Sequence, residues 1–222
     1  MELVRTLGDE NGVVPNGVDA DGLVAAAFDR RSARAILGIP DDARVVGAVA
    51  RLDPVKRLDL LIEAVARIEG ARLVIIGEGT EHARLRQCAI ACGAAERVVF
   101  AGPLPDAAQL MPAFDVFATA SSREGCPLAV LEAMALGVPV VASDIAAHAE
   151  LLPLRCLVPA RVDAFAGMLR LAVQEPTHRE SPAHALWRLA NEGRVRMRYS
   201  VERMVAWHRT VYEAVGEAVA AC

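Results

Sequence analysis

Two glutamates separated by seven residues, Glu124 and Glu132, lie in the otherwise apolar stretch EGCPLAVLEAMALGVPVVAS. Glu132 is the only charged residue between Gly125 and Ser143. A carboxylate in such surroundings loses much of its hydration unless other groups donate hydrogen bonds to it. We therefore expect Glu132 to face a ligand crevice, where a vicinal pair of hydroxyls, such as that of ribose, would each donate one. The alternative is a carboxylate on the exposed side of a surface helix.

Two basic residues, Arg51 and Lys56, lie in the segment ARLDPVKR (50–57), on either side of a turn and a helix start. Helix N-termini attract anions through unpaired N–H groups and the helix dipole. Two cations beside such a terminus predict a phosphate or diphosphate site. The alternative is that both side chains form surface ion pairs with Asp53 and Asp59.

Glycines follow another apolar run in the segment GEGTE (77–81). Gly77 and Gly79 would let the backbone bend sharply or approach a ligand closely. An ordinary turn before a helix explains the same pattern equally well. Because the segment lacks the third glycine and the downstream acid of a dinucleotide fingerprint, nicotinamide and flavin binding are disfavoured.

A second helix start is predicted at Pro127, since proline is tolerated in the first helical turn. The amides of Gly125, Cys126 and Leu128 would then point out from this terminus and form another anion cradle. This cradle would lie next to the first one if the strands that precede the two segments are neighbours.

The elements that position these residues alternate regularly along the chain from Arg44 onward. Apolar runs of strand length alternate with segments of helical spacing, and the runs show no in–out alternation. Both features are typical of a parallel sheet covered on two faces, so we predict a doubly wound, Rossmann-like α/β domain whose ligands bind beyond the carboxyl ends of the strands. The expected strands are 44–50, 71–77, 97–102, 114–120, 138–143 and 155–160, and further helices are expected at 163–174, 182–191 and 201–219. The segment before Arg44 shows no clear element of its own.

Composition excludes several classes of protein. The 222 residues carry a formal net charge of -4, which gives no reason to expect a nucleic-acid partner. The five cysteines contain no metal-ligand spacing beyond one C-x3-C pair, and their odd number argues against a disulfide framework. No apolar run is long enough to span a membrane, and the start MELVRTLGDE does not resemble a signal peptide. We therefore expect a cytoplasmic chain.

Four motifs together carry a family resemblance: RLDPVK (51–56), GEG (77–79), VxFxG (98–102) and EGCPLAVLEAMALGVPVVA (124–142). They resemble the C-terminal, donor-binding domain of retaining GT-B glycosyltransferases of the glycosyltransferase group 1, or family 4, type. The segment VVPNGVD (13–19) resembles the opening of that domain. Each motif alone is weak, whereas the combination is specific and covers nearly the whole chain.

The resemblance implies a nucleotide-sugar donor, with UDP or GDP as the nucleotide, and no metal or other cofactor. Arg51 and Lys56 would hold the donor diphosphate and stabilise the leaving nucleotide, Glu124 would lie against the donor sugar, and Glu132 would bind the ribose hydroxyls. The donor would also contact the backbone at Gly77, Gly79, Gly125, Cys126, Pro127 and Leu128, with residues 101–104 around the base.

The resemblance also implies a division of the chain and a set of partners. Residues 1–14 would be a remnant of an interdomain connection, 15–200 the nucleotide-sugar-binding domain and 201–222 a C-terminal helix. A separate acceptor-binding domain or chain would be needed to transfer a hexosyl group to a glycan or lipid-linked acceptor. The alternative is a non-catalytic module that binds a nucleotide or phosphorylated metabolite and acts with a partner chain.

A basic stretch near the C-terminus leaves membrane contact open. Residues 179–209 contain seven arginines and three glutamates, so this surface could lie at the periphery of the inner membrane. The alternative is that these arginines pair locally or are solvated on a helix.

Overall fold

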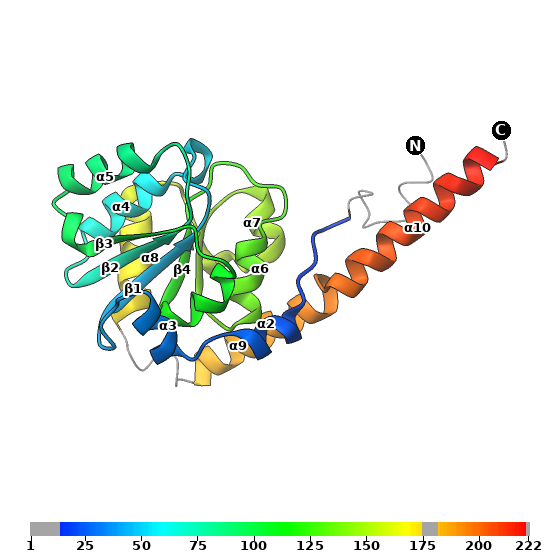
Figure 1. The fold of residues 1–222 in the computed structure, drawn as a ribbon, viewed down its shortest axis with the longest axis horizontal. Coiled ribbons are helices and arrows are strands. Elements are labelled where there is room, and N and C mark those ends of the chain that lie inside the picture. The colour runs from blue at the N-terminus through cyan, green and yellow to red at the C-terminus, as the bar shows by residue number, and fades with distance from the viewer. Residues whose placement is uncertain (1–13, 175–181, 221–222) are drawn as a thin grey trace.

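The computed structural model describes residues 14–174 and 182–220, and in this part of the chain six parallel strands form one sheet in the order β3-β2-β1-β4-β5-β6 (Figure 1). The strands are rich in valine and isoleucine, and their central residues are buried, as expected when helices cover both faces. They are β1 (Arg44–Val49), β2 (Ala71–Ile76), β3 (Val98–Gly102), β4 (Val116–Thr119), β5 (Val140–Ser143) and β6 (Leu157–Val158). The predicted doubly wound α/β fold is confirmed.

Two hydrophobic cores lie on opposite faces of this sheet, because successive strand residues point to opposite sides. On β1, Val45 packs into the core that contains α6 (Leu128–Ala135) and α9 (Pro182–Arg198), whereas Val46 packs into the other core. That second core contains α4 (Leu58–Ala66), α5 (His82–Ala91) and α8 (Val162–Gln174). The sheet is therefore held from both sides by apolar burial.

The segment before β1 contains two helices, so the expectation of no element there is wrong. These are α2 (Ala20–Ala26) and α3 (Arg30–Ile36), each seven residues long. The side chains of Asp19 and Asp29 accept hydrogen bonds from the backbone N–H groups of Gly22 and Ser32, and so cap the two helix starts. Such short helices carry little periodicity, but the two aspartate caps were readable signals.

The carboxyl-terminal half differs from expectation in two further places. Residues Ala146–Leu151 form a helix, α7, where no helix was predicted, and the last strand, β6, is only two residues long. A 3-10 turn at Leu154–Cys156 takes up the start of the expected strand 155–160.

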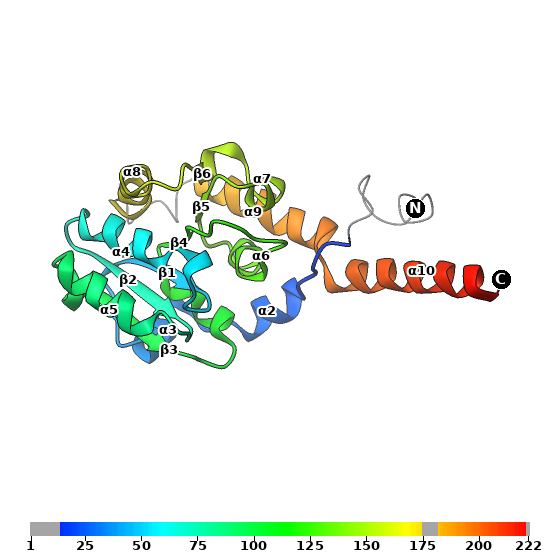
Figure 2. The same cartoon turned by 90° about the horizontal axis from the view of Figure 1, so that it is seen from above.

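Two extra helices follow the sheet domain, as predicted. The first, α9, continues to Arg198, beyond the expected end at 191, and α10 (Val201–Ala220) extends away from the domain in both views (Figures 1 and 2). Val18 forms a β-bridge with Ser200, so the segment that enters the domain is tied to the corner between α9 and α10.

Among the described residues, no helix is both long and apolar enough to cross a membrane. The expected remnant 1–14 lies almost entirely outside the described residues.

Several arginines of the basic C-terminal stretch have local partners within the described ranges. Arg196 pairs with Asp21 and Glu192, Arg194 donates to the carbonyl of Leu151, and Arg203 lies over the ring of Trp207. This agrees with the alternative of local pairing, whereas membrane contact stays a prediction.

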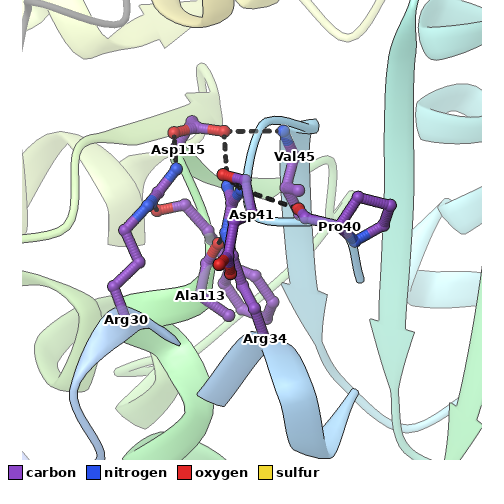
Figure 3. Close-up of polar contacts among 8 residues, drawn as sticks. Arg30, Arg34, Pro40, Asp41, Val45, Ala113 and Asp115 are labelled. Atoms are coloured by element: carbon purple, nitrogen blue, oxygen red, sulfur yellow. Dashed lines mark hydrogen bonds and ion pairs between the residues drawn. The ribbon is translucent and has the colours of Figure 1, made fainter. Parts of the chain in front are cut away.

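A buried ionic cluster lies at the amino ends of β1 and β4 (Figure 3). The guanidinium of Arg34 is fully buried and donates to the carbonyls of Ala113 and Pro40, at 3.0 Å each, and to Asp115 Oδ2 at 3.1 Å. Asp115 also accepts the backbone N–H of Val45 at 2.7 Å. The cluster thus fastens α3 and the β1 start to the chain that leads into β4.

Candidate functional site

A hollow of about 270 Å³ opens beyond the carboxyl ends of β1 and β4. We call it the β1–β4 hollow. The two strands are neighbours, with Val46 opposite Val116, so the segments that follow them meet at one edge of the sheet. Its lining combines polar residues with the start of α6: Asn16, Val49, Ala50, Lys56, Phe117, Thr119, Glu124, Cys126, Pro127, Leu128, Ala129 and Val130.

Lys56 and Glu124 form the charged centre of the hollow. The Lys56 Nζ atom lies 2.6 Å from Glu124 Oε1, and the side chains are 20% and 13% exposed. Backbone contacts bring the two segments together, because the Ser122 N–H donates to the Val55 carbonyl at 2.9 Å. The cation expected to hold a diphosphate is thus bound to the carboxylate expected near the sugar.

The turn that carries Lys56 has an unusual backbone. Pro54 to Lys56 form one turn of 3-10 helix, with proline in its first position, and Arg57 follows with φ at 47°. A non-glycine residue in this left-handed region costs roughly 1–2 kcal/mol. The strained residue is the one that directly follows Lys56, and such strain often collects at functional sites.

A chain of buried polar groups lies behind Glu124. Ser121 Oγ donates to Glu124 Oε1 at 2.7 Å, and Ser143 Oγ donates to the Ser121 carbonyl at 2.6 Å. The His148 Nδ1 atom lies 2.8 Å from the Ser143 carbonyl. All three of these residues are fully buried, so β4, β5 and α7 together support the carboxylate.

The hydrogen-bond partners fix the tautomer of His148. A carbonyl only accepts, so Nδ1 must carry the proton that is donated to Ser143, and Nε2 is left as a bare acceptor. Nε2 is buried and has no partner in the described part of the chain. Burial lowers the pKa of His148, opposed by the hydrogen bond to the Ser143 backbone. The ring is therefore held in its neutral form.

The start of α6 forms the second wall of the hollow. The helix begins at Leu128 after Pro127, and no side chain of the described residues caps it. Gly125 has open space beside it, and the Cys126 carbonyl accepts a hydrogen bond from Asn16 Nδ2 at 2.8 Å. An uncapped helix N-terminus beside a lysine is an environment that favours anions.

Glu132 lies on α6, one turn after Leu128, and does not line the hollow. Its carboxylate is partly buried and has no hydrogen-bond or ion-pair partner among the described residues. Burial raises the pKa of Glu132. Here, then, is a carboxylate that has lost part of its hydration and received no protein donor in return.

Arg51 does not line the hollow, whereas Lys56 does. The Arg51 side chain is 81% exposed and pairs with Asp53 at 3.0 Å, which is the surface ion pair given above as the alternative. Lys56, in contrast, pairs with Glu124 instead of Asp53 or Asp59. The structure therefore brings together only one of the two expected cations with the helix start.

Gly77 and Gly79 are needed by the fold itself. A Cβ on Gly77 would lie 2.0 Å from the carbonyl oxygen of Ala50, and one on Gly79 would lie 2.3 Å from that of Leu52. Both residues also have positive φ angles. The two glycines let the loop after β2 pack against the loop after β1, so their presence does not require a ligand.

Several residues of the site were missed from the sequence. The missed residues surround or support Glu124, and they are Asn16, Thr119, Ser121, Ser143 and His148. Ser121 and Ser143 each stand at or just after the carboxyl end of a strand, the position that locates ligand sites in such sheets. That signal could have identified them.

Comparison with known proteins gives one family. The model of the family described as glycosyl transferases group 1 matches residues 29–184. D-inositol 3-phosphate glycosyltransferase of Stackebrandtia nassauensis is 36% identical over 160 residues, which cover 65% of this chain and 36% of that protein. The Mycobacterium tuberculosis H37Ra protein of the same name is 40% identical over 140 residues, which cover 60% of this chain and 29% of that protein. The chain thus spans about a third of the length of these relatives.

Solved structures share the fold. HepE from Anabaena, in complex with UDP and glucose, has a TM-score of 0.78 and 25% identity, over 96% of this chain and 59% of HepE. Sucrose-phosphate synthase from Thermosynechococcus elongatus has a TM-score of 0.77 and 25% identity, over 92% and 52%. A glycosyltransferase from Rickettsia africae has a TM-score of 0.81 and 17% identity, over 93% of this chain and 58% of that protein. The expected fold, the C-terminal half of a GT-B structure, is confirmed.

Proposed function

The chain belongs to the glycosyl transferases group 1 family, and from that premise we propose that the β1–β4 hollow binds the diphosphate and sugar of a nucleotide-sugar donor. The observation that carries this proposal is the meeting of Lys56, Glu124 and the uncapped start of α6 at one hollow. The enzyme would be a retaining, family 4 hexosyltransferase.

The chemistry required of the site is stabilisation of a leaving diphosphate. In glycosyl transfer the bond between the anomeric carbon and the diphosphate oxygen breaks, and its electron pair leaves with the nucleotide. Lys56 Nζ and the α6 amides would stabilise this added negative charge at the positions where it develops. Arg51 would join them, since an exposed side chain in a surface ion pair turns at little cost.

Glu132 would bind the ribose hydroxyls. Its carboxylate is partly buried without a protein donor, and a vicinal diol would supply two hydrogen bonds to it. Glu124 would lie against the donor sugar, with the backbone from Gly125 through Cys126 and Pro127 to Leu128 beside the sugar or the diphosphate. The loop that contains Gly77 and Gly79 would complete the donor site.

Charge neutralisation by side chains and a helix terminus would take the place of a metal ion. Within the described residues, no group of three or more His, Cys, Asp or Glu side chains could hold one. In this proposal the donor nucleotide is UDP or GDP, and UDP is the first choice because HepE was solved with it.

The acceptor would be bound in part by residues outside this chain. The matched segment covers 36% and 29% of the two relatives, so acceptor recognition would involve residues outside it. We propose a glycan or lipid-linked acceptor that is bound with the help of an acceptor-binding domain or chain.

Isothermal titration calorimetry with UDP, GDP and UDP-glucose tests the proposal. We expect at least one of these ligands to bind, and Lys56→Ala to weaken that binding strongly. Arg67→Ala is the matched control, because Arg67 is an exposed cation that pairs with Asp163 away from the hollow. Absence of binding by all three ligands, or equal effects of the two substitutions, would contradict the proposal.

A further inference from the structure

Glu124 accepts two hydrogen bonds at the same oxygen atom. Among the described residues, Lys56 Nζ lies 2.6 Å and Ser121 Oγ 2.7 Å from Oε1. The two donors differ in what else they could do. Lys56 is a cation on a long, flexible side chain at the wall of the hollow, whereas Ser121 is fully buried and has no freedom to follow a ligand.

Proton counting fixes the direction of the Ser121 hydrogen bond. A serine hydroxyl has one proton, and the ionised carboxylate beside Lys56 only accepts, so the Ser121 proton must point to Glu124. The contact of 3.2 Å between the Thr119 and Ser121 hydroxyls is then donated by Thr119. Hydroxyls in such a series polarise one another and strengthen the final bond.

The backbone of Ser121 is held in turn by the buried groups behind it. The Ser143 hydroxyl donates its one proton to the Ser121 carbonyl, and the neutral His148 ring donates to the Ser143 carbonyl. Burying a polar group costs free energy unless the group forms hydrogen bonds. Here the buried groups bond to one another in series, and the series ends at the Glu124 carboxylate, so the surrounding fold holds that carboxylate in position.

From these contacts we propose that Ser121 is a positioning residue for Glu124, which keeps the carboxylate in place when Lys56 turns from Glu124 to the donor diphosphate. This inference rests on the proposed function, because the diphosphate is what draws Lys56 away. Once Lys56 has turned away, the partly buried Glu124 carboxylate keeps the hydrogen bond from Ser121. Without Ser121 it would lose both of its hydrogen-bond donors. Ser121 therefore stabilises the donor-bound state more than the unbound state.

A double-mutant cycle read out by UDP calorimetry tests the inference. We expect Ser121→Ala to weaken UDP binding roughly three- to tenfold, the scale of coupling between residues in contact. In a Glu124→Ala background the same substitution should leave the UDP affinity unchanged, because there is no carboxylate left to position. A loss of loop structure would instead weaken binding equally in both backgrounds.

Two further variants guard against trivial explanations. Ser121→Thr keeps the hydroxyl and should restore most of the UDP affinity. Ser122→Ala is the matched control, since its exposed hydroxyl bonds to the Val55 carbonyl at 3.2 Å and does not contact Glu124. Thermal unfolding of each variant confirms that it is folded.

The outcomes separate this inference from the proposed function. If the unmodified protein binds none of UDP, GDP and UDP-glucose, both fail; if it binds GDP and not UDP, the same cycle is measured with GDP. If it binds UDP but Ser121→Ala has no effect, or has the same effect with and without Glu124, the positioning role is overturned and the donor site stands.

Discussion

Two charged clusters lie at opposite ends of the same pair of strands. At the amino ends of β1 and β4, the Arg34 guanidinium is enclosed by three carbonyls and Asp115, and Asp115 also binds Arg30 and a backbone N–H. At the carboxyl ends, Lys56 binds Glu124 at the wall of a hollow. The first cluster is sealed by protein partners, whereas the second leaves a lysine that can exchange its partner.

This difference teaches how one sheet serves both stability and binding. A buried charge that donates to fixed carbonyls and to a carboxylate stabilises one arrangement and resists change. A cation held by a single carboxylate can instead be drawn to a stronger anion, such as a diphosphate. The substitutions below should therefore separate the effects on stability from the effects on binding.

The largest effect is expected from Asp115→Ala, which removes the carboxylate but leaves Arg34 buried. We expect the free energy of unfolding to fall by about 3–5 kcal/mol, because an uncompensated charge remains in the interior. Urea denaturation measures this change. The exposed partner of Arg67 provides the control, Asp163→Ala, with an expected change below about 0.5 kcal/mol. A similar small value for Asp115→Ala would break the comparison.

Lys56→Ala should give the reverse pattern. We expect the UDP affinity to fall roughly ten- to a hundredfold, the value of a hydrogen bond to a charged group, while the free energy of unfolding changes by about 1 kcal/mol or less. Calorimetry and urea denaturation on the same preparation measure both quantities. A large loss of stability with unchanged UDP affinity would assign Lys56 to the fold and contradict its role in binding.

Glu132→Gln should stabilise the protein while it weakens UDP binding. Burial raises the pKa of the Glu132 carboxyl above its ordinary value of 4.5, so the folded state binds this proton more readily than the unfolded chain does. At a pH above the raised pKa, the ionised Glu132 carboxylate therefore destabilises the folded state. We expect Glu132→Gln to raise the free energy of unfolding at pH 7 by up to about 1 kcal/mol.

The pH dependence provides the check on Glu132. The gain in stability should disappear as the pH falls toward 4.5, where the native carboxylate becomes protonated. Glu69→Gln, which changes an exposed glutamate, should show neither the gain nor its pH dependence. A loss of stability in Glu132→Gln would mean that the carboxylate has a favourable partner after all.

The smallest effect concerns His148 and the pH. An unfolded histidine titrates near pH 6.5, and burial lowers the pKa of His148 in the fold, so below about pH 6.5 the unfolded chain binds more protons. The free energy of unfolding should therefore fall as the pH decreases through this range. His148→Gln should flatten the profile, whereas His208→Gln on exposed α10 should not. Equal slopes in all three proteins would contradict a buried neutral His148.

Periodicity and strand-end position were enough to predict the sheet and the edge of the sheet at which the hollow lies. The apolar runs gave every strand, and the rule for parallel sheets placed Lys56, Glu124 and the start of α6 at one edge. Residue type alone could not reveal the Lys56–Glu124 pair, because its members are 68 positions apart and the local aspartates offered equally good partners. Gly77 shows the converse, since a glycine suited to a ligand loop is required here by a neighbouring carbonyl.

A crystal structure of the protein with UDP would test the central claim most directly. We expect the diphosphate in the β1–β4 hollow, within hydrogen-bonding distance of Lys56 Nζ and the first amides of α6, with Glu124 still bound to Ser121. UDP bound elsewhere on the molecule, with Lys56 still paired to Glu124, would contradict the account.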